Sequence, residues 1–438
     1  MNVEKIFYVI LSTILVTVFI LFTFVFSPGG FNSSNSSKQK TIYYVDHISP
    51  AHQKVIDLFN ERNKGSVRVE TINLSFEKFS TNERKELLAR YLRSKNNRID
   101  IFSVDQIWVP RFAKWGVPLN KILDSSEVNS IIPQALETCI YKDSIVAVPL
   151  YIDIGVMFYR DDLLKNEPDY PQLVEKLKNS ITWEEFLDLS KRYKHMPNPF
   201  YIFQADDYEG LICSFTEIMA NHGNPVINKK DEILLDTPEG RKSLQFLVNM
   251  VNLYRISPKH VTELKENDSY RFYARTNGIF LRAWPSMIDD DNNFLSDEIR
   301  SNLKMAPLPH LKGSNPGLVF GGWDLMISKF SDKKPEVLKF AKFLLSEESQ
   351  KIMFEEGRYL PINKKLYSDK NFISKYPDLS FFNNLYQFGI HRPFLEDYTN
   401  VSDILSYYLN LAMKNEINVD EALKEATKKI NEKVILVK

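Results

Sequence analysis

Strand-like and helix-like segments alternate from residue 41 onward, and this order restricts the fold more than any other feature of the chain. Short runs rich in β-branched and aromatic residues are each followed by an amphipathic segment. Ser49 can cap the first of these helices, and Pro50 suits its first turn. The expected strands and helices occupy residues 41–49, 50–63, 67–74, 83–95 and 98–105. A βαβαβ order predicts a parallel sheet that binds ligands at the carboxyl ends of its strands.

The length of the chain and one long apolar run indicate a second unit. At 438 residues, the chain exceeds what one hydrophobic core usually serves. IVAVPLYIDIGVMFYR, residues 145–160, is an almost unbroken β-like run, long enough to leave one lobe and enter another. Helical patterns dominate beyond this run, where Thr182 and Glu185 form a capping box. We therefore expect an α/β protein with two lobes.

The first 40 residues differ in composition from the rest of the chain. Residues 6–26 are 21 consecutive residues without a charge, enough to cross a hydrocarbon core of about 30 Å as a helix. A secretory signal has a shorter apolar region and a small-residue cleavage site, so a retained anchor is favoured over a cleaved signal. We expect residues 1–26 to form this signal or membrane-anchor segment. Residues 27–40, rich in Ser, Asn and Gly, are expected to form a flexible linker.

Charge and motifs argue against several functional classes. The 56 basic and 56 acidic residues give a formal charge of zero, which offers no reason to expect nucleic acid as a partner. Cys139 and Cys213 are the only cysteines, so the body does not rely on a disulfide framework. The sequence contains no GxSxG, HExxH, P-loop or CxxC motif. The acidic run at 289–293 lacks the glycine and distal glutamate of a calcium loop, so neither a metal nor a cofactor is expected.

A series of segments in a characteristic order carries a resemblance to a known family. These segments are DIFSVDQIWVPRFAKWG, AVPLYIDIGVMFYRDDLL, ITWEEFLDLSKRY, DTPEGRKSLQFL, GIFLRAWPSM, APLPHLKG, FGGWDLMIS, FAKFLLSEESQKIMFEEGRYLPINKKLY and HRPFLEDYTNVSDIL. In this order they resemble the extracellular solute-binding proteins of ABC transporters, in the branch that includes the maltose- and trehalose-binding proteins. The resemblance covers residues 41–438.

The resemblance implies a two-lobed periplasmic-binding-protein-like fold of type II, with a ligand cleft between its lobes, preceded by the N-terminal transmembrane or signal helix. Lobe one would comprise residues 41–150 and 306–357, and lobe two residues 154–305 and 358–438. Such a protein is not an enzyme. It would hold a carbohydrate, expected to be an oligosaccharide, in the cleft and close on it by a hinge motion.

The same resemblance implies partners and a location. The partners would be the permease subunits of an ABC importer, together with the membrane through the N-terminal segment. The body would be exported and would lie at the extracytoplasmic face of the cell membrane, anchored there, or in the periplasm.

Sugar recognition needs aromatic rings that cover C–H faces, together with carboxylates, amides and arginines that bind hydroxyls. The candidate ligand residues, chosen by type, by place at a strand end or crossover, or by match to the family, are Asp46, Asp105, Trp108, Tyr151, Asp153, Trp284, Gly321, Gly322, Trp323 and Arg392. Asp153 interrupts an apolar run, and a buried unpaired carboxylate is costly, so its side chain is expected to face the cleft. By the resemblance, Gly321 and Gly322 bring main-chain groups to the ligand and Trp323 covers its face.

Several candidates have structural alternatives that the sequence leaves open. Asp105 suits an N-cap, and Trp108 has the apolar neighbours of a core residue. The glycine pair could form a β-bulge beside a packed tryptophan, and Arg392 could form an inter-lobe salt bridge. For the whole protein, the alternatives are a ligand-sensing protein that acts on a membrane receptor kinase and an exported carbohydrate-active enzyme.

Overall fold

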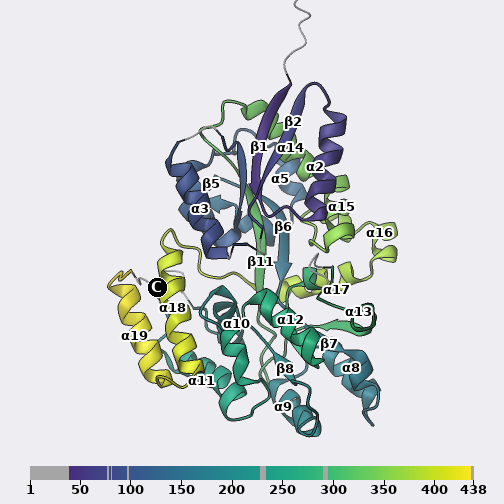
Figure 1. Cartoon of the computed structure of the whole chain (residues 1–438), viewed down its shortest axis with the longest axis vertical. Coiled ribbons are helices and arrows are strands. Elements are labelled where there is room, and N and C mark those ends of the chain that lie inside the picture. Colours follow the sequence, from purple (N-terminus) through teal and green to yellow (C-terminus); the bar gives the residue numbers. More distant parts are fainter. Residues whose placement is uncertain are drawn as a thin grey trace, which may run out of the picture.

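A computed structural model describes residues 39–75, 78–79, 81–95, 98–226, 233–289 and 294–435. Figure 1 shows two α/β lobes stacked along the long axis, each with helices around a sheet. The expected two-lobed α/β architecture is therefore confirmed. The proposed membrane or signal segment, residues 6–26, lies outside the described residues, as does the linker up to residue 38. Within the described residues, no helix has both the length and the apolar character needed to span a bilayer.

The first sheet contains the three strands that were predicted near the N-terminal end of the chain body. Its strand order is β12 (Gly389–Ile390), β11 (Leu318–Ile327), β3 (Ile101–Asp105), β1 (Lys40–Asp46) and β2 (Val67–Asn73), and β6 (Val148–Ile154) also pairs with β11. Strand β1 runs parallel to both β2 and β3, so the predicted parallel βαβαβ unit is confirmed. The helices between these strands are α2 (Pro50–Arg62) and α3 (Thr81–Arg93). The Ser49 side chain caps α2, as predicted, by accepting a hydrogen bond from the main-chain N–H of His52.

Strand β1 separates two hydrophobic cores because alternate side chains along a strand point to opposite faces of the sheet. On one face, Ile42 and Tyr44 pack in the core that contains Phe59 of α2. On the other face, Val45 packs in the core that contains Trp108. The carboxyl ends of β1 and β3, where Asp46 and Asp105 lie, are thereby held between two packed layers.

The second sheet has four short strands and a core rich in aromatic side chains. Its order is β10 (Leu303–Ala306), β7 (Val156–Arg160), β9 (Phe280–Ala283) and β8 (Tyr201–Ile202). Phe186 packs edge-on against Phe280 of β9, with ring centroids 4.9 Å apart. The helix that carries Phe186 begins with the predicted capping box of Thr182 and Glu185. These contacts tie the helical layer to the second sheet.

The remaining elements surround the two sheets. In chain order the helices are α4 (Val109–Phe112), α5 (Ser125–Ser130), α6 (Pro133–Glu137), α7 (Asp161–Leu164), α8 (Tyr170–Lys178), α9 (Trp183–Arg192), α10 (Glu209–Asn221), α11 (Pro238–Asn252), α12 (Glu266–Thr276), α13 (Asp297–Asn302), α14 (Lys334–Leu344), α15 (Glu347–Gly357), α16 (Lys370–Lys375), α17 (Asp378–Leu385), α18 (Tyr398–Met413) and α19 (Val419–Asn431). A separate hairpin is formed by β4 (Ile140–Tyr141) and β5 (Ser144–Ile145). In Figure 1, α18 and α19 lie beside α10 and α11 in the lower lobe.

The chain passes from the first sheet to the second at Gly155, the one residue between β6 and β7. A side chain at Gly155 would meet a buried ion pair, because a Cβ atom there would lie 2.6 Å from Glu217 Oε1 and 2.9 Å from Arg282 Nη2. The Arg282 side chain is fully buried and donates to Glu217 Oε1 at 2.7 Å. The apolar run at 145–160 thus changes sheets at a residue that must lack a side chain.

The predicted division of the chain into lobes stays a prediction, and sheet membership bears on it at three places. Strand β6 remains in the first sheet up to Ile154, and β10 remains in the second sheet up to Ala306. The short strand β12 pairs with β11 of the first sheet. Cys139 and Cys213 are both buried and unpaired, so the body contains no disulfide between them.

We predict that Gly155→Ala lowers the free energy of unfolding by about 1–3 kcal/mol, the usual cost of overpacking a core. Urea denaturation of the purified variant measures this loss. The matched control compares the same substitution in a Glu217→Ala background, where the clash with the carboxylate is absent and the cost should be smaller. Equal costs in both backgrounds would contradict the proposed clash.

Candidate functional site

A cavity of about 640 Å³ is lined by residues of both lobes. Eight of the ten candidate ligand residues line it, namely Asp105, Tyr151, Asp153, Trp284, Gly321, Gly322, Trp323 and Arg392. Asp46 and Trp108 instead lie behind the wall of the cavity, next to a small internal space beneath Trp323. Most of the chosen residues are therefore brought to one place, although they come from segments up to about 290 positions apart in the sequence.

The two glycines of β11 give the cavity wall its close packing. Gly321 pairs in register with Asp153, and a Cβ atom there would lie 3.0 Å from Cζ3 of the Trp284 ring. Gly322 has a φ of +130°, a value that favours glycine, and a Cβ atom there would lie 2.5 Å from the carbonyl oxygen of Tyr151. Both positions therefore exclude a side chain for separate reasons.

The pairing of β11 with β6 shifts between Trp323 and Asp324. Such an irregularity bends a strand and re-aims its side chains. The glycine segment therefore adjoins an irregularity of the strand and also lines the cavity, while its contact with ligand stays a prediction. Asp324, directly after the shift, is buried in the sheet, and burial raises the pKa of its carboxyl group to about 7.

The Trp323 ring packs against a buried ion pair formed by Arg84 and Asp46. Its side chain is only 9% exposed, and the Trp108 ring meets it edge-on with centroids 6.2 Å apart. The Arg84 guanidinium lies over the Trp323 ring at 4.2 Å and donates to Asp46 Oδ1 at 3.0 Å. Arg84 is itself buried and needs a counter-charge, which Asp46 supplies. Asp46 and Trp108 thus position the cavity wall, while their predicted contact with ligand gains no support from this placement.

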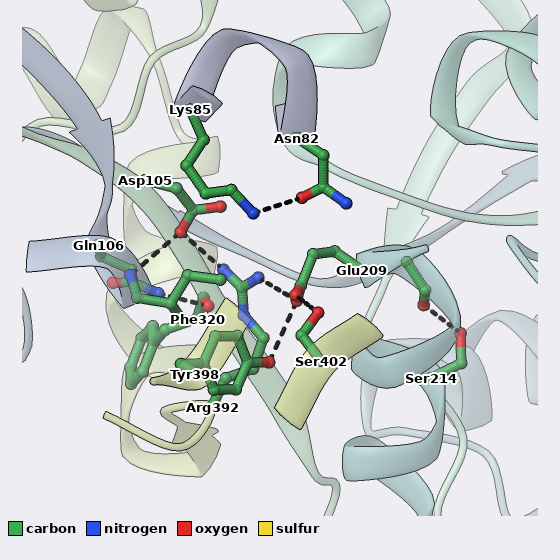
Figure 2. A network of polar contacts seen from close by, with 12 residues as sticks. Asn82, Lys85, Asp105, Gln106, Glu209, Ser214, Phe320, Arg392, Tyr398 and Ser402 are labelled. Atoms are coloured by element: carbon green, nitrogen blue, oxygen red, sulfur yellow. Dashed lines mark hydrogen bonds and ion pairs between the residues drawn. The ribbon is translucent and has the colours of Figure 1, made fainter. Parts of the chain in front are cut away.

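Arg392 joins the two lobes at one side of the cavity, as Figure 2 shows. Its Nη2 donates to Asp105 Oδ1 at 3.0 Å, and its Nη1 donates to Glu209 Oε2 at 2.9 Å. Asp105 ends β3, whereas Glu209 begins α10 and also accepts hydrogen bonds from Tyr398, at 3.1 Å, and from Ser402. Arg392 therefore both lines the cavity and forms the inter-lobe salt bridge that the sequence left as an alternative.

Burial and neighbouring charges shift the pKa values of the groups in this ion-pair network in opposite directions. Burial alone would lower the pKa of Arg392, but Asp105 and Glu209 raise it well above its ordinary value. Burial raises the pKa of Asp105, and Arg392 offsets part of that rise. Asp105 also accepts a hydrogen bond from the main-chain N–H of Ile107 at 3.2 Å, so its expected N-cap role is present as well. The guanidinium is thus held in its charged form between two carboxylates.

Aromatic side chains form much of the remaining wall. Trp284 follows β9, and its main-chain N–H donates to the Tyr270 hydroxyl of α12 at 3.4 Å. The buried Arg282 guanidinium lies over the Trp284 ring at 4.3 Å. Tyr151 and Tyr359 contact each other with ring centroids 4.5 Å apart. Flat apolar faces and hydrogen-bonding groups are therefore mixed along the cavity, which suits a polar ligand with apolar faces.

Sequence reasoning missed several lining residues at the starts of helices in the second lobe. They are Tyr208 and Glu209 before and within α10, and Lys265, Glu266, Asn267, Asp268, Tyr270 and Arg271 around the start of α12. Acidic residues in a first helical turn are ordinary because they favour the helix dipole, so the sequence offered no signal that these face a cleft. Tyr359 also lines the cavity. In the part of the chain that the structure describes, no group of three or more His, Cys, Asp or Glu side chains is placed to hold a metal ion.

Two α/β lobes with a ligand-sized cavity between them have the arrangement expected of a binding protein. Over residues 45–351 the chain matches the family described as bacterial extracellular solute-binding protein. The chain belongs to this family. Its members bind solutes without chemical conversion and act outside the cytoplasm, so the protein is an exported binding protein and not an enzyme.

Individual relatives agree with this assignment. A protein of Deinococcus radiodurans described as a probable ABC transporter-binding protein is 26% identical over 340 residues, covering 74% of this chain and 77% of the relative. The maltose-bound MalE3 of T. maritima is 26% identical, with a TM-score of 0.80 over 90% of this chain and 100% of MalE3. A solute-binding protein of Thermotoga lettingae bound with α-D-tagatose shares the fold, with 21% identity and a TM-score of 0.78 over 90% and 99% of the two chains.

We predict that the two tryptophans of the cavity differ in their effect on stability. Trp323→Ala should lower the free energy of unfolding by about 3–5 kcal/mol, because the ring is nearly buried and supports Arg84. Trp284→Ala should cost less, because its ring is only partly buried. Chemical denaturation of both variants provides the comparison, and a larger loss for Trp284→Ala would contradict this assignment of roles.

We also predict that Arg392→Met destabilises the protein by about 3–5 kcal/mol near pH 7, because it leaves two buried carboxylates without a counter-charge. Without the arginine, burial should raise the folded-state pKa of Asp105 further above its unfolded value. The loss should therefore shrink as the pH falls, because the Asp105 carboxyl group of the folded variant becomes protonated and no longer carries an unpaired charge. Unfolding measured at successively lower pH tests the sign. The triple variant that adds Asp105→Asn and Glu209→Gln should remove most of the pH dependence.

Proposed function

We propose that the protein is the substrate-binding component of an ABC importer for sugars, and that an oligosaccharide binds non-covalently in the cavity. The observation that carries the proposal is the cavity itself, which combines aromatic rings with paired and unpaired carboxylates. Its volume of about 640 Å³ lies within the range of about 300–1,000 Å³ typical of small-molecule sites. MalE3, the relative with bound maltose, supports the choice of a sugar.

The chemistry of each lining side chain determines the contact with ligand that we propose for it. Trp284 and Trp323 would cover the C–H faces of sugar rings, because aromatic faces favour such apolar surfaces. Asp153 and Glu266 would accept hydrogen bonds from hydroxyl groups, and Arg392 would donate them. Gly321 has no side chain, which would leave room for the Trp284 ring to lie against β11.

Closure of the lobes would couple binding to delivery. Arg392 contacts one carboxylate from each lobe, so a movement of one lobe relative to the other changes a buried ion-pair network. We propose that ligand stabilises the closed arrangement and that permease subunits in the membrane accept the closed form. The segment at residues 6–26 would keep the body at the extracytoplasmic face as an anchor, or would direct it to the periplasm as a signal.

We predict micromolar or tighter binding of at least one member of a panel of mono- and oligosaccharides, measured by isothermal titration calorimetry. Trp284→Ala should weaken that binding by about tenfold or more, because the ring face is lost from the wall. Leu253→Ala, a change at an exposed side chain outside the cavity, is the control and should leave the affinity unchanged. Binding of a peptide or metal ion with no affinity for any sugar would refute the carbohydrate proposal.

A further inference from the structure

Two carboxyl groups that line the cavity, Asp153 of β6 and Glu266 of α12, have no cationic partner among the described residues. Asp153 accepts a hydrogen bond from the main-chain N–H of Ile154 at 3.1 Å. Glu266 accepts one from the indole N–H of Trp284 at 3.5 Å. Among the described residues, neither carboxylate lies within ion-pair distance of a lysine, arginine or histidine, whereas Asp105 and Glu209 share Arg392. Asp153 and Glu266 thus differ from Asp105 and Glu209 in that no cation of the described residues pairs with them.

The nearest buried cation does not pair with these two carboxyl groups. Arg282 is fully buried, does not line the cavity and is committed to Glu217 at 2.7 Å. It lies beneath the Trp284 ring, which separates it from the cavity. Its charge lowers the pKa of both Asp153 and Glu266, but burial has the larger effect. Burial raises the pKa of Asp153 to about 8, so this carboxylate lacks the stabilisation that a partner would give.

Aromatic side chains surround the same carboxylates. The hydroxyl groups of Tyr151, Tyr270 and Tyr386 are close enough to Asp153 that its negative charge contributes to raising their pKa values. Burial raises the pKa of Tyr208, which also lines the cavity, and the nearby Glu266 carboxylate raises it further. Carboxylates set among aromatic rings are the arrangement that binds an ammonium group, because the rings and the carboxylates both attract positive charge.

The basic residues that line the cavity do not cancel this preference. Lys78, Lys265 and Arg271 are exposed, so water and salt screen their charges. Arg271 is also paired with Asp268 at 3.1 Å. The buried Arg392 is matched by two carboxylates of its own. The basic residues therefore leave the carboxyl groups of Asp153 and Glu266 available to a cationic ligand, which would favour their charged forms.

We propose that the cavity binds a carbohydrate that carries a protonated amine, with the ammonium group placed between Asp153 and Glu266. This inference rests on the proposed function and narrows its ligand class from neutral sugars to amino sugars. The ammonium would supply the counter-charge that the described residues do not provide for these two groups, and the sugar rings would contact Trp284. Binding involves no covalent step.

The test compares three disaccharides of the same linkage by isothermal titration calorimetry at about pH 6.5. They are β-1,4-linked diglucosamine, its N,N′-diacetyl form and cellobiose, which differ only at the amine positions. We expect diglucosamine to bind about tenfold or more tightly than either neutral sugar, as for a buried charge-assisted contact. Asp153→Asn and Glu266→Gln should each remove most of this preference. Glu263→Gln, a change at an exposed acid that precedes α12 and lies outside the cavity lining, is the matched control and should retain it.

A second readout separates charge recognition from a change in packing. At about pH 6.5 the Asp153 carboxyl group is largely protonated in the free protein, and a bound ammonium favours its charged form, so binding should release protons. Titrations in two buffers of different ionisation enthalpy measure that release, which Asp153→Asn should abolish. Equal or tighter binding of cellobiose overturns the amine inference and leaves sugar binding intact. Failure of a broad sugar panel, amino sugars included, overturns both proposals.

Discussion

The arrangement of the site depends on one buried cation that is shared between two lobes. Arg392 is held by Asp105 at the end of a first-lobe strand and by Glu209 at the start of a second-lobe helix. A buried charge without partners would be costly, and here the guanidinium is compensated by one carboxylate from each lobe. Both walls of the cavity are positioned relative to this network. The same interaction therefore contributes to folding, to the relative placement of the lobes and to the chemistry of the cavity.

Strand β11 gives the cavity its shape. It pairs with β3 and with the crossover strand β6, so the polar residues at the ends of both strands meet along it. Gly321 allows the Trp284 ring of the other lobe to lie against the strand, and the register shift after Trp323 changes the direction of the side chains that follow. The Trp284 ring can approach the backbone of β11 only because Gly321 has no side chain.

Sequence reasoning succeeded where the signal was local. Alternating apolar patterns predicted the parallel unit, and eight of the candidate residues line the cavity, although most of its lining was not predicted. Asp46 could not be distinguished from Asp105 by sequence alone, since both follow a strand. The difference depends on Arg84, which belongs to a polar helix yet is buried against Trp323. Glu266 was missed because an acid in a first helical turn is ordinary, and only the tertiary structure turns that helix end toward the cavity.

The single residue between β6 and β7 has a mechanical consequence. A connection of one residue offers few torsion angles, so relative movement of the two sheets along this path must occur at Gly155 and its immediate neighbours. The buried pair of Glu217 and Arg282 fills the space beside that residue and limits how far the backbone can rotate there. Because only Gly155 joins β6 to β7, a displacement of one strand along this path displaces the other as well.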